Sequence, residues 1–444
     1  MMPVNGKSFY NVYKMLEHFS KNFKQIVSSL KAIPDSNEFS SQVWDYVRRT
    51  ERLTINFQVV RNGLDQTDIK TVNAFGYRRL NLIDWVIFIT SLANVLRISV
   101  LIFNTNDTVS FYLGDPLFQS KDQLPLITWC GLAIFVNFIF REWILYLEAN
   151  GKLKVLSIWK EYRDGVKLVD LRMSNRNIKQ FRFSVYCVSL VFNNVMIGLP
   201  IFLSILFFTP LLTNPWTYKV PKLAFFGIIW SFSVIFAVTY LLNSILGFAW
   251  YILCVFTFHL FRLLDLVDFA DFLLKQTNEN LCNEKDIQFF SLLVIRRLNS
   301  FELASFKLRY IFLCYVIVYS AAGDVYIFLG VVVRVYSNFF ADLVAIFGIF
   351  ILPTLGFFGL AFGKLITELD RLTIRLHRLT IRSKFSINTM SKVLEIMDRV
   401  AGPYNGVKIG DFLTLEKTFF ILFILENITT LMLITINVRP LIST

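Results

Sequence analysis

The chain has 444 residues, of which 55% are hydrophobic and 47 are phenylalanine, and its mean hydropathy is +0.55. This composition excludes an ordinary soluble domain, which carries fewer apolar residues. The formal net charge is +13. We attribute that charge to basic loops on one side of a membrane and to the attraction of an anionic inner leaflet, and we expect no nucleic-acid partner.

Apolar segments recur along the chain and predict an all-α integral membrane protein with seven transmembrane helices. Each segment is about long enough to cross a hydrocarbon core of ~30 Å, which takes roughly 20 helical residues. The seven predicted spans cover residues 82–103, 124–140, 183–211, 223–258, 310–333, 338–363 and 418–438.

Basic residues between the spans predict the orientation of the chain. Of the 45 Lys and Arg residues, 37 lie in four alternate segments: 1–81, 141–181, 259–309 and 364–416. The loop 104–123 between the first two spans holds only Lys121. Because basic loops stay in the cytoplasm, we expect a cytoplasmic N-terminus and an extracellular C-terminus in the cell membrane. A G-protein-coupled receptor has the opposite orientation.

The spans divide the chain into six predicted regions. Within the first region, residues 8–33 form a basic amphipathic pattern that lies either on the inner membrane surface or on the protein's own cytoplasmic part. A second charged helix is expected over 38–62. The regions are a cytoplasmic helical region 1–81, spans one to four in 82–258, a cytoplasmic segment 259–309, spans five and six in 310–363, a second cytoplasmic segment 364–416, and the last helix with its tail in 417–444.

The fourth apolar segment is longer than one bilayer crossing. No Lys, Arg, Asp or Glu occurs from Leu223 to Phe261, which is about 58 Å of helix. We interpret it as one helix that leaves the membrane and continues into the cytoplasm. Residues 284–309 run into the fifth span in the same way, and the sixth span continues into 365–379. Their apolar stripes predict a helical anchor bundle below the membrane, whose faces can also meet neighbouring subunits.

The last span carries polar residues along one face. At about 100° per residue, Thr430 and Asn437 lie about 40° and 20° from Glu426, and Phe423, Leu433 and Ile434 complete the stripe. Polar groups inside a span are costly and face protein or water. Two interpretations remain open at this point: the stripe lines a pore, or it forms hydrogen bonds to other helices of the same subunit.

The C-terminal region resembles the insect-type gustatory and odorant receptor superfamily, a superfamily of ligand-gated ion channels. Its gustatory members end in a span with a Thr-Tyr pair, five mostly apolar residues and a Gln-Phe pair. In this chain Thr430 and the five-residue spacing match, while Leu431 replaces the Tyr, Asn437 the Gln and Val438 the Phe. The preceding segment 410–417 is similar to the glycine- and aromatic-containing approach to the last span of that family.

The resemblance covers roughly residues 80–438 and implies a homotetrameric or heterotetrameric, non-selective cation channel with a central pore lined by the last helix. The long polar N-terminal region fits a divergent branch, such as the nematode gustatory-receptor-like or serpentine receptor class r proteins. Asn437 takes the position of the family's pore glutamine, and Ile434 and Val438 that of the apolar gate. Glu426 has no counterpart in the family pattern. The expected pore-lining residues are Glu426, Thr430, Ile434, Asn437 and Val438.

The resemblance also implies a pocket for a small-molecule ligand in the outer half, among spans two to six. Asp324 is the strongest candidate, because a carboxylate inside a span is usually functional. A structural pairing of Asp324 with Arg97 or Arg334 is the alternative. The ligand-binding candidates are Trp129, Trp230, Phe236, Tyr240, Tyr319, Asp324 and Tyr326.

Other functions fit the residues less well. A non-conducting receptor or structural subunit with the same fold is the main alternative, and a transporter would show internal repeats that we do not find. Three scattered histidines and no clustered nucleophile predict that the protein is not an enzyme and uses no metal or cofactor. Asn106 begins a glycosylation acceptor tripeptide in a predicted outer loop. Membrane lipid is the other expected partner.

Overall fold

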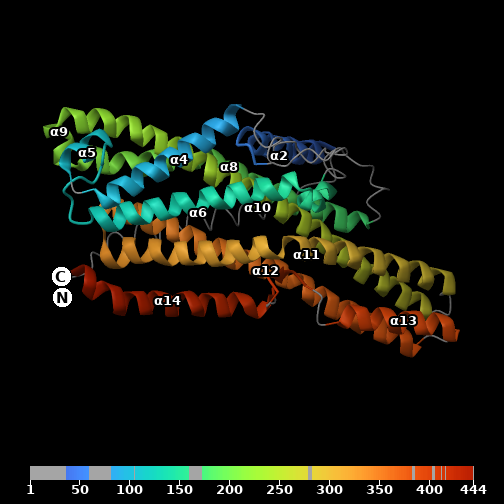
Figure 1. The fold of residues 1–444 in the computed structure, drawn as a ribbon. Coiled ribbons are helices and arrows are strands. Elements are labelled where there is room, and N and C mark those ends of the chain that lie inside the picture. Colours follow the sequence, from blue (N-terminus) through green and yellow to red (C-terminus); the bar gives the residue numbers. More distant parts are fainter. Residues whose placement is uncertain are drawn as a thin grey trace.

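A computed structural model describes residues 37–59, 82–104, 106–159, 173–278, 283–382, 386–402, 406–411, 413–415 and 417–443 (Figure 1). The predicted amphipathic helix over 8–33 lies outside these residues. The described part is almost entirely helical, as the sequence predicts. Within it, the only strands are β1 (Lys408–Ile409) and β2 (Leu413–Thr414), which pair as a short antiparallel hairpin before the last helix.

Six of the described helices are long and apolar enough to cross a membrane. The last helix, α14 (Lys417–Ser443), contains a shorter apolar run, Ile421–Asn437. A fold with six such helices is typical of a multi-pass membrane protein. The six are α4 (Leu82–Phe103), α6 (Gln123–Ala149), α8 (Asn175–Thr213), α10 (Pro221–Asn278), α11 (Glu284–Ile327), which continues into the π-helical turn η3 (Phe328–Val333), and α12 (Asn338–Arg382).

The predicted long helices are confirmed. α10 is a single unbroken helix of 58 residues, and α11 starts at Glu284, where the Asn283 side chain accepts a hydrogen bond from the Lys285 N–H and caps it. Two predicted spans are shorter than the helices that contain them. α8 begins at Asn175 and passes through Pro200 and Pro210, and α6 runs on to Ala149.

The two ends of the bundle differ (Figure 1). At one, the short-loop end, lie the short helices α5 (Asp107–Tyr112) and α9 (Pro215–Lys219) and the turn between η3 and α12. At the other, the extended end, α10, α11 and α12 project together with α13 (Ile387–Ala401). This arrangement matches the predicted anchor bundle built from three long helices.

Two smaller elements complete the fold towards the extended end. α2 (Asn37–Asn56) packs against α8, where the Thr50 hydroxyl donates to the Ser189 carbonyl at 3.2 Å. The 3-10 helix η2 (Lys152–Trp159) follows α6 and contacts α10 and α11. α2 occupies part of the predicted charged helix over 38–62.

The hydrophobic core is divided into two clusters. The larger fills the extended half of the bundle and is rich in aromatic side chains, with Trp250, Phe256 and Phe301 fully buried. The smaller cluster lies in the short-loop half and includes Ile127, Leu241 and Val344. The smaller cluster surrounds a cavity.

Buried ion pairs tie helices together in the apolar interior. The Arg141 guanidinium donates to Asp84 Oδ1 at 2.6 Å and joins α6 to α4. In the extended half, Arg297 of α11 reaches Asp265 of α10 at 2.9 Å. Removing one partner of such a pair leaves a buried charge, which typically costs about 3–5 kcal/mol.

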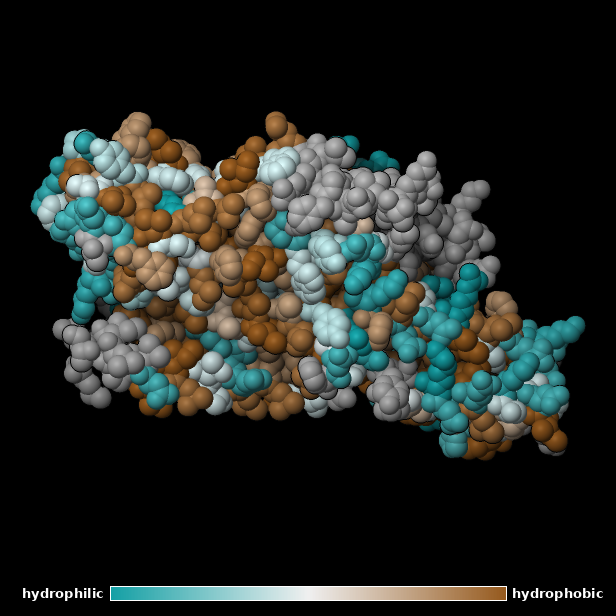
Figure 2. Space-filling view, in the orientation of Figure 1, coloured by the Kyte–Doolittle hydropathy of each residue, from teal (hydrophilic) through white to brown (hydrophobic). Residues whose placement is uncertain are grey.

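The surface agrees with a membrane-embedded middle. Figure 2 shows hydrophobic side chains over the central part of the visible face, with hydrophilic side chains gathered at the two ends. Large apolar side chains such as Ile201, Phe232 and Phe350 are more than 60% exposed. Exposure of this kind is stable when lipid rather than water covers the surface.

Candidate ligand cavity and last helix

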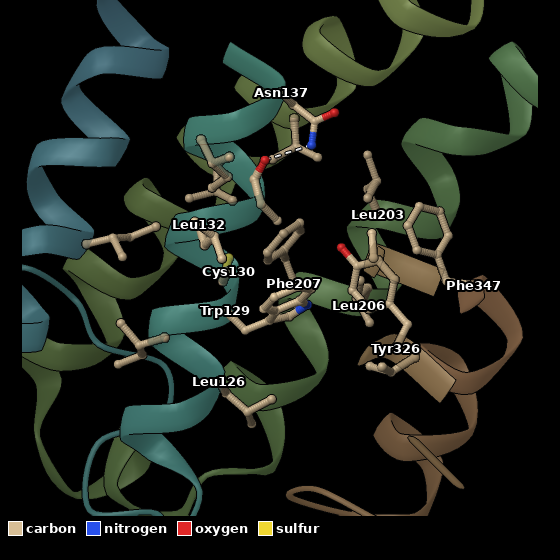
Figure 3. Close-up of a pocket in the computed structure, with 18 of the residues that line it drawn as sticks. Leu126, Trp129, Cys130, Leu132, Asn137, Leu203, Leu206, Phe207, Tyr326 and Phe347 are labelled. Atoms are coloured by element: carbon tan, nitrogen blue, oxygen red, sulfur yellow. Dashed lines mark hydrogen bonds between the residues drawn. The ribbon is translucent and has the colours of Figure 1, made fainter. Parts of the chain in front are cut away.

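A cavity of about 430 Å³ lies inside the short-loop half of the bundle (Figure 3). Side chains from α4, α6, α8, α10, α11, η3 and α12 line it. Its volume falls in the range of small-molecule sites, which run from about 300 to 1,000 Å³. Most of the wall is aliphatic or aromatic, and Figure 3 shows Trp129, Phe207 and Tyr326 around the open space.

One polar pair sits at the end of the cavity nearer the extended half. The Tyr319 hydroxyl donates to Asn137 Oδ1 at 2.9 Å, and the Asn137 amide N–H donates to the Ala133 carbonyl at 2.7 Å. These two hydrogen bonds fix the side chain of Asn137 against α6 and link it to α11. The pair therefore joins two walls of the cavity.

Arg97 supplies a charge at the opposite end. Its Nε donates to the Leu113 carbonyl at 2.7 Å and its Nη2 to the Gly114 carbonyl at 2.9 Å. The guanidinium also lies 5.0 Å from the ring of Trp230, which is a cation–π distance. Arg97 thus connects α4 to the loop after α5 and forms part of the cavity wall.

The loop that accepts these hydrogen bonds has a conformation that only glycine adopts easily. Gly114 has a φ of +59°, and a Cβ there would lie 2.5 Å from the backbone nitrogen of Gly227. Both facts require glycine at this position, where the loop lies directly on α10. Next to it, burial raises the pKa of the Asp115 carboxyl, although the Leu117 N–H, the Gln123 side chain and Arg97 oppose this effect.

The structure brings together three of the seven predicted ligand-binding residues. Trp129, Tyr319 and Tyr326 line the cavity, and the rings of Trp129 and Tyr326 meet edge to face with centroids 6.0 Å apart. Trp230 is not in the wall but contacts it through Arg97. Phe236 and Tyr240 pack on each other, with ring centroids 4.7 Å apart, and are also absent from the wall.

Asp324 lies outside the cavity, on the side of α11 that faces α14. It is buried, and its Oδ1 has no hydrogen-bond partner among the described residues. No ion pair joins it to Arg97 or Arg334 within the described part of the chain. One turn earlier on α11, the Ser320 hydroxyl donates to Asn427 Oδ1 of α14 at 2.7 Å. Asp324 therefore belongs to the contact between α11 and the last helix.

α14 lies at the edge of the bundle, packed against α12, η3 and α11 (Figure 1). The predicted pore face is divided by this packing. Glu426 and Asn437 are exposed, whereas Thr430 and Ile434 are half-buried, and Ile434 contacts the smaller core cluster. The side chain of Val438 lies outside the described part of the structure. The assignment of these residues to a pore stays a prediction.

Sequence reasoning missed two of the polar residues in the cavity wall, Asn137 and Ser231, and did not assign Arg97 to the pocket. The signal for all three is the same: each is a polar residue inside an apolar span, where such groups face protein or water. The spans of this chain hold many polar residues, so that signal alone does not show which of them meet at one cavity.

Metal-ligating residues do not gather in the described part of the structure. No group of three or more His, Cys, Asp or Glu side chains there is arranged to hold a metal ion. The four cysteines that it includes, Cys130, Cys187, Cys254 and Cys314, are free thiols. Asn106 is exposed and caps α5, with its side-chain oxygen accepting from the Thr108 N–H at 3.0 Å.

No protein-family model and no curated protein matches this sequence. The function is therefore inferred from the cavity, the last helix and the distribution of charge.

Proposed function

We propose that the protein is a chemosensory receptor of gustatory-receptor type that acts as a ligand-gated, non-selective cation channel. The observation that carries this proposal is the cavity of about 430 Å³ enclosed by six long helices. α14 packs on the outside of the same half of the bundle. A small molecule in the cavity contacts α11, η3 and α12, and these are the elements that hold α14.

We place seven helices in the membrane, with α14 as the seventh, and the extended end in the cytoplasm. The distribution of 37 of 45 basic residues among the alternate segments supports this orientation. It puts α5, α9 and Asn106 outside the cell, together with the C-terminus. It also puts α13 and the far ends of α10 to α12 inside.

Four subunits would surround one pore. Support comes from apolar side chains that remain exposed on the extended end, where water rather than lipid would otherwise cover them: Ile374, Ile381, Ile387 and Leu394 are between 48% and 88% exposed. Contact between subunits buries such surfaces. The tetramer is expected to be held mainly there.

The pore-facing side of α14 is assigned from its polar residues. Glu426 and Asn437 are exposed on α14, and a ring of four Glu426 carboxylates favours cations. Two adjacent faces of α14 are compatible with a pore-lining role. One continues from Glu426 through Thr430 and Ile434, and the other continues through the exposed Thr429 and Leu433.

A non-conducting receptor or structural subunit is the second candidate. The packing of Ile434 against the smaller core cluster favours it, because a helix that only completes the bundle needs no water-filled face. This alternative keeps the cavity and its ligand but lacks a pore.

Current recorded from the purified protein, reconstituted alone in lipid bilayers, tests the proposal. Single cysteines placed through 422–437 are then exposed to a water-soluble thiol reagent. A pore predicts block with a three-to-four-residue period, and the phase of that period selects the Thr430 or the Thr429 face. Protection of every position, or no current under any ligand, would establish the non-conducting alternative.

A further inference from the structure

The shape of the cavity restricts what fits in it. On α6 its wall runs from Leu126 to Asn137, a rise of about 16 Å along the helix. On α11 and η3 it runs from Ile317 to Leu329, which is about 18 Å. The space is therefore elongated along the helix axes, and an extended chain fills it better than a compact ring system.

Two polar residues of the wall, Arg97 and Trp129, carry hydrogen-bond donors and no acceptor, whereas the hydroxyl and amide groups of the wall can do both. Arg97 is the one charged residue among the described residues that line the cavity, and the buried Asp115 near it is not part of the wall. A guanidinium has five N–H groups, and hydrogen bonds to protein carbonyls occupy only two of them in Arg97. No carboxylate of the described residues lies within 4.0 Å of it. The indole N–H of Trp129 is also buried and makes no hydrogen bond within 3.5 Å, although the Tyr326 hydroxyl is near enough to interact with it.

Among the carboxylates of the described residues, the Arg97 charge is offset only by Asp115, which lies beyond ion-pair distance, and Arg97 keeps N–H groups that no protein carbonyl occupies. Buried donors without full hydrogen bonding cost free energy, and an acceptor that pairs with them recovers it. At the other end of the cavity the polar groups are neutral, and Asn137 and Tyr319 already bond to each other, while Asn137 also bonds to the Ala133 carbonyl. The two ends are thus chemically different. One requires an acceptor, and the other is satisfied without a ligand.

We propose that the cavity binds an elongated apolar molecule with a single polar end, a hydrogen-bond acceptor oxygen held by Arg97 and assisted by Trp129, and that it rejects amines. The proposal rests on the cavity being the ligand pocket of the proposed receptor but not on ion conduction. The apolar tail lies along α6 and α11 and ends near Asn137. A carboxylate and a neutral carbonyl share the required chemistry, and the experiment separates them.

An ammonium ligand is the opposing possibility, since Trp129, Tyr319 and Tyr326 present aromatic faces that attract cations. Two charges of the same sign repel more strongly in a buried site of low dielectric constant than in water. The Arg97 charge therefore disfavours an amine wherever its head occupies the same end of the cavity. A competition experiment with an amine of equal chain length decides between them.

The test uses the full-length protein in lipid nanodiscs and a decanoate probe that carries a photoreactive diazirine on its tail. Decanoate, methyl octyl ketone, decylamine and decane compete with the probe, and mass spectrometry locates the labelled residues. We expect labelling of α6 and α11 near Asn137. We also expect competition by decanoate and the ketone at concentrations at least tenfold lower than by decylamine or decane.

Variants locate the head group. Arg97→Gln should weaken decanoate at least tenfold and the ketone less, and Trp129→Phe, which keeps the ring but removes the N–H, should weaken both severalfold. Ala322→Phe fills the cavity and should abolish labelling. Val191→Phe places the same ring on the exposed face of α8 and should leave labelling unchanged. If Arg97→Gln fails to fold, the competitor series and Trp129→Phe still decide the question.

Equal competition by decylamine, or labelling that survives Ala322→Phe, would overturn the proposal. Labelling needs no current, so binding of the probe without conduction would refute only the channel function. Conduction together with labelling elsewhere would refute only the ligand assignment.

Discussion

The close packing of η3 on α12 gives the most direct test of the structure. A Cβ on Gly330 would lie 2.5 Å from the Ala341 carbonyl oxygen and 2.5 Å from the Ala345 nitrogen. Both are backbone atoms of α12 and cannot rotate away. Small residues allow this kind of approach between membrane helices. Gly330→Ala should therefore push the helix pair apart and destabilise the fold.

The matched control is Gly198→Ala in α8, where a Cβ meets no atom within 4 Å. Both substitutions gain a similar helix-propensity term, about 0.8–1 kcal/mol in an ideal helix. Their difference therefore isolates the steric term, which for overpacking is about 1–3 kcal/mol. Because 1 kcal/mol of stability corresponds to on the order of 2 °C in the unfolding midpoint of a large chain, Gly330→Ala should unfold about 2–6 °C below Gly198→Ala.

The free thiols of the chain provide the assay. Cys254 is buried, so a thiol-reactive fluorophore reports unfolding of the detergent-solubilised protein as that thiol becomes accessible. Apparent midpoints are compared at one heating rate, because unfolding of such proteins is irreversible. Equal midpoints for the two variants would refute the close approach of η3 to α12.

Four further results are expected. Asp84→Leu or Arg141→Met alone should lower the free energy of unfolding by about 3–5 kcal/mol in the same unfolding assay. The double variant should recover most of that loss, and a double variant whose loss equals the sum of the two single losses would contradict the ion pair. Asn106→Gln should remove a glycosidase-sensitive gel shift in expressing cells, and a wild-type protein without that shift would count against an outer position for α5. Glu426→Gln should lower conductance or the cation-to-anion permeability ratio, and unchanged permeation would assign Glu426 to helix contacts instead. Mass photometry in detergent should find tetramers that dissociate when the apolar side chains of 374–394 are made polar, whereas monomers alone would exclude this assembly.

The long helices could be predicted because their signal is local. No charge and no proline interrupt the stretch 223–261, so nothing in the sequence breaks α10, and the structure has one helix there. The predicted spans 310–333 and 338–363 likewise leave only residues 334–337 for the turn between η3 and α12. The π-helical turn itself could not be predicted, because it depends on how Gly330 packs on α12 rather than on the residues of the turn alone.

The cavity was harder to predict because it is defined by what side chains leave empty. Aromatic residues in the outer halves of the spans looked equivalent in the sequence, yet Trp129 and Tyr326 face the open space while Phe236 and Tyr240 pack on each other. Whether a residue faces the cavity depends on how its helix is rotated about its own axis. Contacts between helices set that rotation, and the residue pattern of one helix does not reveal them.

The length of α10 has a mechanical consequence. The cavity touches α10 between Ser231 and Leu242, and the helix ends at Asn278, 36 residues and about 54 Å further on. For a straight rod pivoting at the cavity, a tilt of about 1° displaces the far end by about 1 Å, since the arm is about 54 Å long. A change of side-chain packing that tilts α10 at the cavity would therefore be amplified at the extended end, because the helix is unbroken between the two.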